Sequence, residues 1–387
     1  MWYRRHRNNP RSVPIQATAV LAATILVAGS QSEVRAQSSW DEAIDIFAAG
    51  IARDVEVDGI GSIAAAVFVG DEVTWARGFG VVNRDTGRRA GPRNIYRTGS
   101  ISKSVTAVLM MLLVQDGVLG LDDPIAGILP EVEALTDAKP GQAALTFRHL
   151  ASHTGGLIRE PTLQGAASGP IGNWESKILE SIPATGYQTG PGEAYSYSNI
   201  GYAILGLALS RATGRPFMDL VTERIFRPLG MSSSTFVVGN SLRRRLAAGY
   251  ENRNDEIDAT FPAREHAGRG YKVPNGGVYS TVGDLARFAA GVSGALGLLD
   301  EDMRAAMLSI ETPESDIVGY GLGFSLRRDG YGTLWANHGG SVAGYTAHLL
   351  FNPESQLGVV LLRNYNTGKT NLGEAALDLA RKLRSEL

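Results

Sequence analysis

The chain has 387 residues, of which 44% are hydrophobic and 20% are charged, so it can bury a sizeable core as one large domain or two ordinary ones. The formal net charge is −2 and no extended basic patch appears, which argues against a nucleic-acid-binding protein. The sequence contains no cysteine, which excludes disulfides, thiolate metal sites and a cysteine-linked lipid anchor.

The first 36 residues have the layout of a signal peptide. Four arginines between positions 4 and 11 precede a mostly apolar run over 15–29, and Val34-Arg35-Ala36 offers small residues to a signal peptidase. A membrane anchor is the alternative, but about 15 apolar residues are fewer than the ~20 that a spanning helix needs. We expect residues 1–36 to be removed, which leaves one domain over 37–387 with a net charge of −6. An exported chain without disulfides suits a bacterial periplasm or exterior, without stable membrane insertion.

The spacing of apolar residues predicts the following elements in chain order. A β-hairpin is expected over 62–69 and 73–82, joined across Gly70-Asp71, and a helix with one buried face is expected over 100–116. The chain from about 121 to 269 is rich in turns, with helical pieces at 200–213 and 218–226. Strand patterns then return at 323–328, 333–336, 345–352 and 357–363, and a terminal amphipathic helix is expected over 372–387.

This order of elements predicts an α+β fold. Strands near both chain ends would form one antiparallel sheet flanked by helices, and the turn-rich block would form an inserted, mainly helical lobe. We expect the sheet region to comprise about 40–120 and 270–387, and the lobe about 121–269. A cleft between the sheet and the lobe is the natural place for a ligand.

The stretch TGSISKSV, residues 98–105, places a serine and a lysine one helical turn apart. Residues three apart on a helix share a face, and the first turn leaves backbone N–H groups free. A serine hydroxyl becomes a good nucleophile when a base takes its proton, and a lysine can serve if burial or nearby cations favour its neutral form. Ser100 and Lys103 are therefore a candidate nucleophile and base. The alternative is a helix-capping serine beside a solvated lysine.

Two later stretches supply candidate partners. Tyr197 and Asn199, in EAYSYSNIGY, lie before an apolar helix, where a phenol can relay a proton and an amide can hold a substrate carbonyl or the lysine. A plain turn is the alternative there. The stretch NHGGSVAGY, residues 337–345, is expected to connect two strands, and its glycines would let a substrate backbone approach a strand edge. The Ser341 N–H would then join that of Ser100 in an oxyanion hole.

In this order, S-x-x-K, Y-x-N and a basic residue-x-Gly triad resemble the active-site set of the serine β-lactamase and penicillin-binding-protein superfamily. The Y-x-N form is similar to that of class C β-lactamases, the related D,D-peptidases and the esterases on the same fold. The likeness begins near Trp40 and covers nearly all of the remaining chain. It includes LASHTGGL at 150–157, YSNIGYAILG at 197–206, FRPLGM at 226–231, GGVYSTVGDLARF at 276–288 and YGLGF at 320–324.

The resemblance implies a role for each matching residue. Ser100 would be the acylated nucleophile, Lys103 its proton acceptor, and Tyr197 the group that shuttles the proton and activates water for deacylation. The backbone N–H groups of Ser100 and Ser341 would form the oxyanion hole, and His338 would occupy the basic position of the third triad. The substrate-binding residues it implies are Asn199, His338, Gly340 and Ser341. It also implies a sheet-plus-lobe fold, a small-molecule or short-peptide substrate, and no cofactor.

His338 departs from the strong β-lactamases of this group, which carry a lysine there. Because a histidine with an ordinary pKa of about 6.5 is charged only part of the time, carboxylate recognition should be weaker or should depend on acidic pH. A β-lactam ring is the first candidate substrate. The alternatives are a D-alanyl-D-alanine carboxypeptidase or D-aminopeptidase-like peptidase, and a carboxylesterase. An alternative of another class is a penicillin-binding sensor that is acylated without turnover.

Other conspicuous residues are given structural roles. His153, in SHTGG, is expected to lie in a tight turn rather than to act in catalysis, and Thr281 with Asp284 is expected to cap a helix. Arg363 is expected to be a surface arginine, with contact to a substrate carboxylate as the alternative. The remaining histidines lack metal-ligand spacing, so no metal centre is expected, and no G-x-S-x-G motif occurs.

Overall fold

The structure, a computed structural model, describes residues 19–253, 256–312, 315 and 317–386. The predicted signal peptide lies partly outside these residues. Its described part begins a helix, α1 (Ala19–Asp58), that continues past residue 36, and removal of the peptide stays a prediction. Within the described ranges, no helix is both long enough and apolar enough to span a membrane.

In the described part of the chain, eight antiparallel strands form one sheet in the order β3-β2-β1-β12-β11-β10-β9-β8. The early strands are β1 (Ser62–Val69), β2 (Glu72–Asn83) and β3 (Arg88–Arg89). The late strands are β8 (Val318–Tyr320), β9 (Ser325–Arg328), β10 (Leu334–Val342), β11 (Tyr345–Phe351) and β12 (Leu357–Arg363). Because β1 pairs with β12, the two ends of the chain meet in the middle of the sheet, as the sequence predicts.

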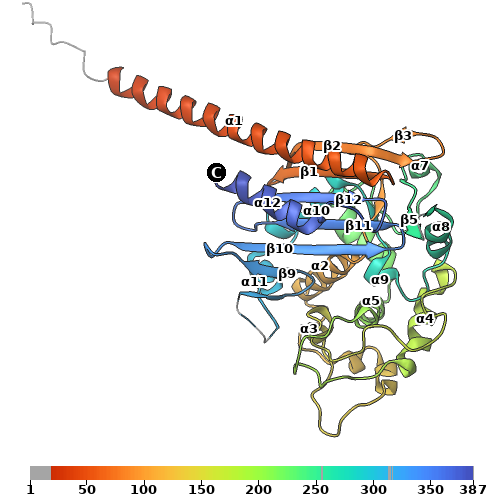
Figure 1. Cartoon of the computed structure of the whole chain (residues 1–387). Helices are drawn as coiled ribbons and strands as arrows, with labels where there is room; N and C mark the ends of the chain where they lie inside the picture. The colour runs from red at the N-terminus through yellow and green to blue at the C-terminus, as the bar shows by residue number, and fades with distance from the viewer. Residues whose placement is uncertain (1–18, 254–255, 313–314, 316, 387) are drawn as a thin grey trace, which may run out of the picture.

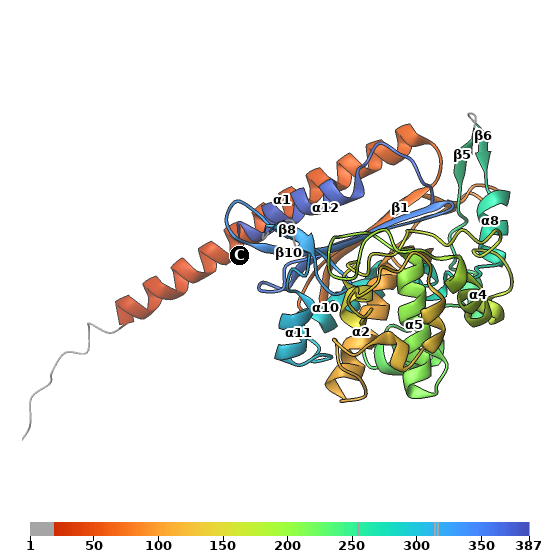
Figure 2. The same cartoon turned by 90° about the horizontal axis from the view of Figure 1, so that it is seen from below.

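Both faces of this sheet are covered by helices. Figures 1 and 2 show α1 beside α12 (Leu372–Arg384) on one face, with α2 (Ile101–Gln115), α10 (Val282–Ser293) and the lobe on the other. In β1, Ile63, Ala65 and Val67 pack toward α1 and α12. The alternate residues Ala64, Ala66 and Phe68 pack with α2 and α10. Burial on both faces explains why β1 reads as an unbroken apolar run rather than as an alternating one.

The sequence pattern did not single out the part of α1 that packs against the sheet. Its buried residues Ile44, Ala48, Ile51 and Val55 are spaced four, three and four apart, which is the stripe of an amphipathic helix. They contact the residues of α12 that face the sheet, so this segment belongs to the folded domain.

The lobe contains the helices α3 (Phe147–Ala151), α4 (Trp174–Ser181), α5 (Asn199–Thr213), α6 (Phe217–Val221), α7 (Asn240–Arg243) and α8 (Thr260–Ala267). A π-helical turn (Thr222–Phe226) follows α6 and completes the predicted helical piece at 218–226. A short hairpin of β5 (Glu251–Arg253) and β6 (Glu256–Asp258) precedes α8. Beyond the lobe lie α9 (Val273–Gly276) and α11 (Glu301–Met307), and β4 (Tyr96–Arg97) pairs with β7 (Tyr279–Ser280) just before α2.

Two predictions about the late strands and their surroundings are wrong. The predicted connection over 337–345 is mostly strand, because β10 stays paired with β11 as far as Val342 opposite Tyr345 and leaves only Ala343 and Gly344 as the turn. Arg363 is not a surface residue. It is 5% exposed, and its guanidinium donates to backbone carbonyls including those of Thr370 and Asn366, so it is not available to a substrate.

Candidate active site

Ser100 is presented at the start of α2 by a backbone turn that requires glycine. Gly99 has a φ of +52°, and a Cβ there would lie 2.7 Å from the backbone nitrogen of Ser341. Gly340 faces the same turn from β10, and a Cβ there would lie 1.9 Å from the carbonyl oxygen of Thr98. A side chain at either glycine would push the serine turn away from β10.

This close approach puts two backbone N–H groups on one side of the serine. A Cβ built on Gly340 would lie 3.2 Å from the backbone nitrogen of Ser100, and the nitrogen of Ser341 lies beside Gly99. Ser100 is at the N-cap of α2, where helical N–H groups have no partner within the helix. The two N–H groups can therefore converge on a carbonyl oxygen held at Ser100, the arrangement of an oxyanion hole.

Lys103 is completely buried beneath the serine. Its Nζ lies 3.0 Å from Ser100 Oγ and donates to the carbonyl of Asn275 at 3.2 Å. Burial lowers the pKa of Lys103 well below its usual value, and the nearby Arg159 guanidinium adds to this effect. A lowered pKa favours the neutral amine, whose lone pair can take the serine proton. The burial of Lys103 excludes the solvated-lysine alternative.

Tyr197 and Asn199 approach the serine from the N-terminal end of α5. The Tyr197 phenol lies close enough to Ser100 to interact with it, and burial raises the pKa of Tyr197, so it is a neutral phenol at ordinary pH. The Lys103 Nζ lies 4.7 Å from the centre of the Tyr197 ring. The Asn199 amide donates to Glu160 at 2.6 Å and does not hold the lysine, whose carbonyl partner is that of Asn275.

His338 lies on β10 behind the serine, where it is 4% exposed. Its Nδ1 donates to the carbonyl of Gly339 at 2.7 Å, and its Nε2 accepts a hydrogen bond from the Tyr320 hydroxyl at 2.9 Å. Burial is the largest cause that lowers the pKa of His338, to about 3. His338 is therefore neutral at ordinary pH, and the expectation that mildly acidic pH would charge it for carboxylate binding is wrong.

His153 belongs to the site more closely than its sequence context indicates. Its ring lies 4.1 Å from the Tyr197 ring, centre to centre, and 4.8 Å from both the Tyr202 and the Tyr320 rings. Its Nδ1 accepts the backbone N–H of Ser198 at 3.1 Å. The residue adopts a φ of +60°, a left-handed conformation in which histidine is found more often than most other side chains.

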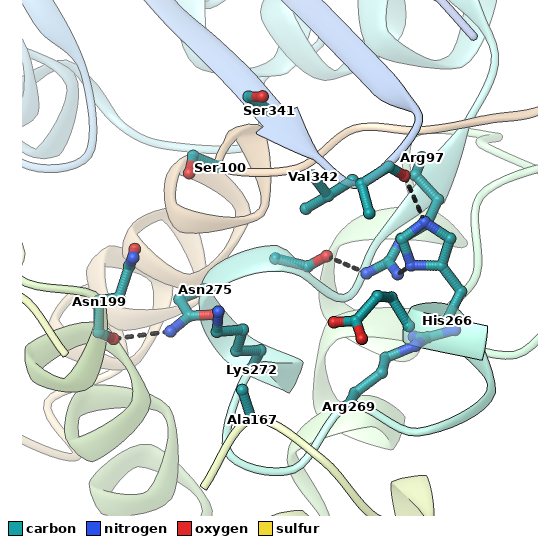
Figure 3. A pocket seen from close by; sticks show the side chains of 13 residues that line it. Arg97, Ser100, Ala167, Asn199, His266, Arg269, Lys272, Asn275, Ser341 and Val342 are labelled. Carbon is teal, nitrogen blue, oxygen red and sulfur yellow. Dashed lines mark hydrogen bonds between the residues drawn. The ribbon is translucent and has the colours of Figure 1, made fainter. Parts of the chain in front are cut away.

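A pocket of about 140 Å³ opens beside Ser100, Asn199 and Ser341. Figure 3 shows Asn199 and Lys272 on one side of this pocket and His266 with Arg97 on the other. His338 and Tyr197 are not among the residues that line it. The pattern reasoning missed several residues that do contribute to the pocket or to the groups beneath it, namely Arg97, Arg159, His266, Lys272 and Asn275. Only GGVYSTVGDLARF, directly after Asn275, pointed to that part of the chain.

Within the residues that the structure describes, no group of three or more His, Cys, Asp or Glu side chains is placed to hold a metal ion. The predicted cap is present, because Thr281 accepts the backbone N–H of Asp284 at the start of α10. The site groups that the structure brings together are thus a serine, a buried lysine with a lowered pKa, a neutral phenol and paired backbone donors.

Comparison with known proteins gives a consistent picture. The sequence profile of the family described as Beta-lactamase matches residues 47–382. The chain is 30% identical over 338 residues to "Penicillin-binding protein 4" of Amycolatopsis lactamdurans, covering 84% of this chain and 85% of that protein. It is 25% identical to "D-alanyl-D-alanine-carboxypeptidase/endopeptidase AmpH" of Escherichia coli (strain K12), covering 75% of this chain and 76% of that protein.

The fold also matches solved structures. One is "EstCE1, a hydrolase with promiscuous acyltransferase activity", with a TM-score of 0.75 and 19% sequence identity over 89% of this chain and 99% of that one. At this identity the likeness concerns the arrangement of sheet and lobe. It confirms the predicted α+β architecture.

Proposed function

The chain belongs to the beta-lactamase family and is a serine hydrolase of the β-lactamase and penicillin-binding-protein superfamily, and from this premise we propose that it cleaves small carboxylic esters or amides through an acyl-enzyme on Ser100. The observation that carries the proposal is the buried Lys103, whose Nζ lies 3.0 Å from Ser100 Oγ and whose pKa is lowered by burial. A nucleophile and a base within hydrogen-bond reach are the minimum for acyl transfer.

The proposed reaction has two halves. Lys103 takes the Ser100 proton as Oγ attacks the substrate carbonyl, and the oxyanion is stabilised by the N–H groups of Ser100 and Ser341. The proton passes to the leaving group through the Tyr197 phenol, and the bond to the leaving group breaks to give the acyl-enzyme. Water then attacks the ester and its proton passes to Lys103, with the Tyr197 phenol able to relay it by giving up its own proton. Lys103 returns the proton to Oγ as the ester bond breaks, which releases the acid and restores Ser100.

The state of His338 favours esters and amides over β-lactams. A neutral, buried imidazole engaged with Tyr320 supplies no charge to a substrate carboxylate, and it does not line the pocket. The β-lactam ring, first among the substrates that the sequence pattern suggested, therefore becomes the second candidate. Lys272 supports it, because this partly exposed ammonium lines the pocket 3.9 Å from Glu160 and is able to attract a carboxylate. The name of the Escherichia coli relative adds D-alanyl peptides to the substrates to try.

The test compares kcat/KM for p-nitrophenyl acetate and a chromogenic cephalosporin in the wild type, Ser100→Ala and Ser176→Ala. Ser176 is an exposed serine of α4 and serves as the matched control. We expect ester turnover in the wild type and the control and a loss of about 10⁴-fold or more in Ser100→Ala, in line with other nucleophile deletions.

Each other result would change the proposal. Turnover retained by Ser100→Ala would refute the mechanism. Cephalosporin turnover far above ester turnover would make the β-lactam the substrate, and replacement of Lys272 by glutamine should then raise KM for it. A single burst of acylation without turnover would favour the penicillin-binding sensor.

A further inference from the structure

A second pocket, larger than the one beside Ser100, lies on the other side of His266. Its volume is about 650 Å³, against about 140 Å³ for the first. Small side chains make up much of its wall, together with the rings of Tyr279 and Tyr345. The alanines that line it are Ala247, Ala248, Ala259, Ala263 and Ala267.

Among the residues that the structure describes, His266 is the one that lines both pockets. It comes from the last turn of α8, with Glu265 facing the first pocket and Ala267 facing the second. Its ring centre lies 5.5 Å from that of Tyr345. The imidazole therefore separates the pocket next to the nucleophile from the second pocket, which is lined largely by alanines.

The ring of His266 is fixed from both ends. Its Nε2 donates to the carbonyl of Ala343 at 2.6 Å, and its Nδ1 accepts from the guanidinium of Arg97. Arg97 is 3% exposed and donates in turn to the carbonyl of Gly276 at 2.7 Å. Burial and the charge of Arg97 lower the pKa of His266 to about 3, so the imidazole that separates the pockets is uncharged at ordinary pH.

We propose that the second pocket is an extension of the substrate site for an uncharged apolar chain, and that His266 is the residue that limits the length of the group accepted beside Ser100. The inference rests on the proposed function, since the apolar chain in the second pocket would be part of an ester or amide substrate. Methyl groups and aromatic faces are surfaces that bind methylenes. Each methylene moved out of water there strengthens binding about fourfold. Removal of the imidazole would join the two pockets.

The first experiment measures kcat/KM for p-nitrophenyl acetate and p-nitrophenyl octanoate. We expect His266→Ala to raise the octanoate-to-acetate ratio at least tenfold over the wild type. His266→Gln should keep the wild-type ratio, because its amide can still donate to Ala343 and accept from Arg97. Arg264→Ala, an exposed position on the same helix, is the matched control.

A second substitution tests whether the octanoyl group of the substrate occupies the second pocket. Ala263 lines that pocket and not the first, so His266→Ala combined with Ala263→Phe should return the ratio to the wild-type value. A ratio that stays unchanged in folded His266→Ala, or one that Ala263→Phe does not reverse, overturns the inference. If His266→Ala does not fold, His266→Ser also removes the imidazole between the pockets and is measured in its place.

A binding measurement separates this inference from the proposed function. Octanamide and acetamide are titrated calorimetrically into Ser100→Ala and into Ser100→Ala combined with His266→Ala. We expect octanamide to bind at least fivefold more tightly to the second protein, with acetamide unchanged. Equal octanamide affinities refute the second pocket. A wild type that cleaves no ester refutes the proposed function while the binding result still decides the role of His266.

Discussion

The groups beneath Ser100 and the wall around His266 are built in opposite ways. Beneath the serine lies a buried cluster, which we call the floor, whose members touch one another through rings and hydrogen bonds. Its members are Lys103, His153, Tyr197, Tyr202, Tyr320 and His338. The helix α8 (Thr260–Ala267), which carries His266, is here called the wall. In this helix only Pro262 is buried. It is held to the β10–β11 turn through the contact of Pro262 with Gly344 and the bonds of His266.

This difference separates chemistry from selectivity. Burial favours the neutral forms of the titratable members of the floor, because it lowers the pKa of the lysine and the histidines and raises the pKa of the tyrosines. A change to one member therefore alters the protonation or position of its neighbours. Most residues of α8 are exposed, so they can change and alter which substrate fits without altering how it reacts.

The largest expected effect comes from Lys103→Met, which keeps the shape of the side chain and removes the base. We expect kcat/KM for p-nitrophenyl acetate to fall by about 10⁴-fold. Stability should not fall, because methionine does not carry the free-energy penalty of burying an amine. Urea unfolding measures the second point, and Lys369→Met, at an exposed position, is the control. A strongly destabilised variant would show that Lys103 has a structural role in the floor in place of the role of proton acceptor.

A smaller effect is expected from His153→Asn, which tests whether the floor positions Tyr197. Asparagine tolerates a positive φ but has no ring to pack against the phenol. We expect kcat to fall by about 10²-fold with KM little changed, as for a misplaced catalytic group. His149→Asn, at a half-buried histidine in α3, should have no such effect on kcat. An equal loss in both variants, or a change in KM alone, would contradict a positioning role for His153.

The smallest effect concerns the acid stability of the floor. The native pKa of His338 is about 3, below its unfolded value of about 6.5, so the unfolded state binds more protons between these values and stability falls as pH drops through this window. At pH 5 this histidine should contribute about 2 kcal/mol of destabilisation relative to pH 7. His338→Gln does not titrate and should lose that much less on acidification. Urea midpoints at the two pH values measure the difference, and identical losses in both proteins would show that His338 is not neutral in the fold.

Much of the architecture follows from local patterns that the structure confirms. The hairpin, the helix that begins at Ser100, and β11 and β12 lie within a few residues of their predicted bounds, because each is an apolar run closed by turn residues. The serine-lysine spacing also indicated a shared helical face, and the two side chains do meet. The length of β10 was missed, since glycines beside His338 are typical of turns and only pairing with β11 carries them within a strand.

The sequence alone determined the order of the motifs, the elements that carry them and the family to which they belong, because these depend on neighbours within a few residues of one another. Only the tertiary structure decided how the pKa values of the side chains in those motifs are shifted. The pKa of Lys103 is lowered because the side chain is buried and lies close to Arg159, which is 56 positions away in the chain. His338 is neutral because it is buried on β10, between the paired strands β9 and β11. The pKa of a side chain depends on its burial and on the charges around it, and in this protein both come from segments far apart in sequence.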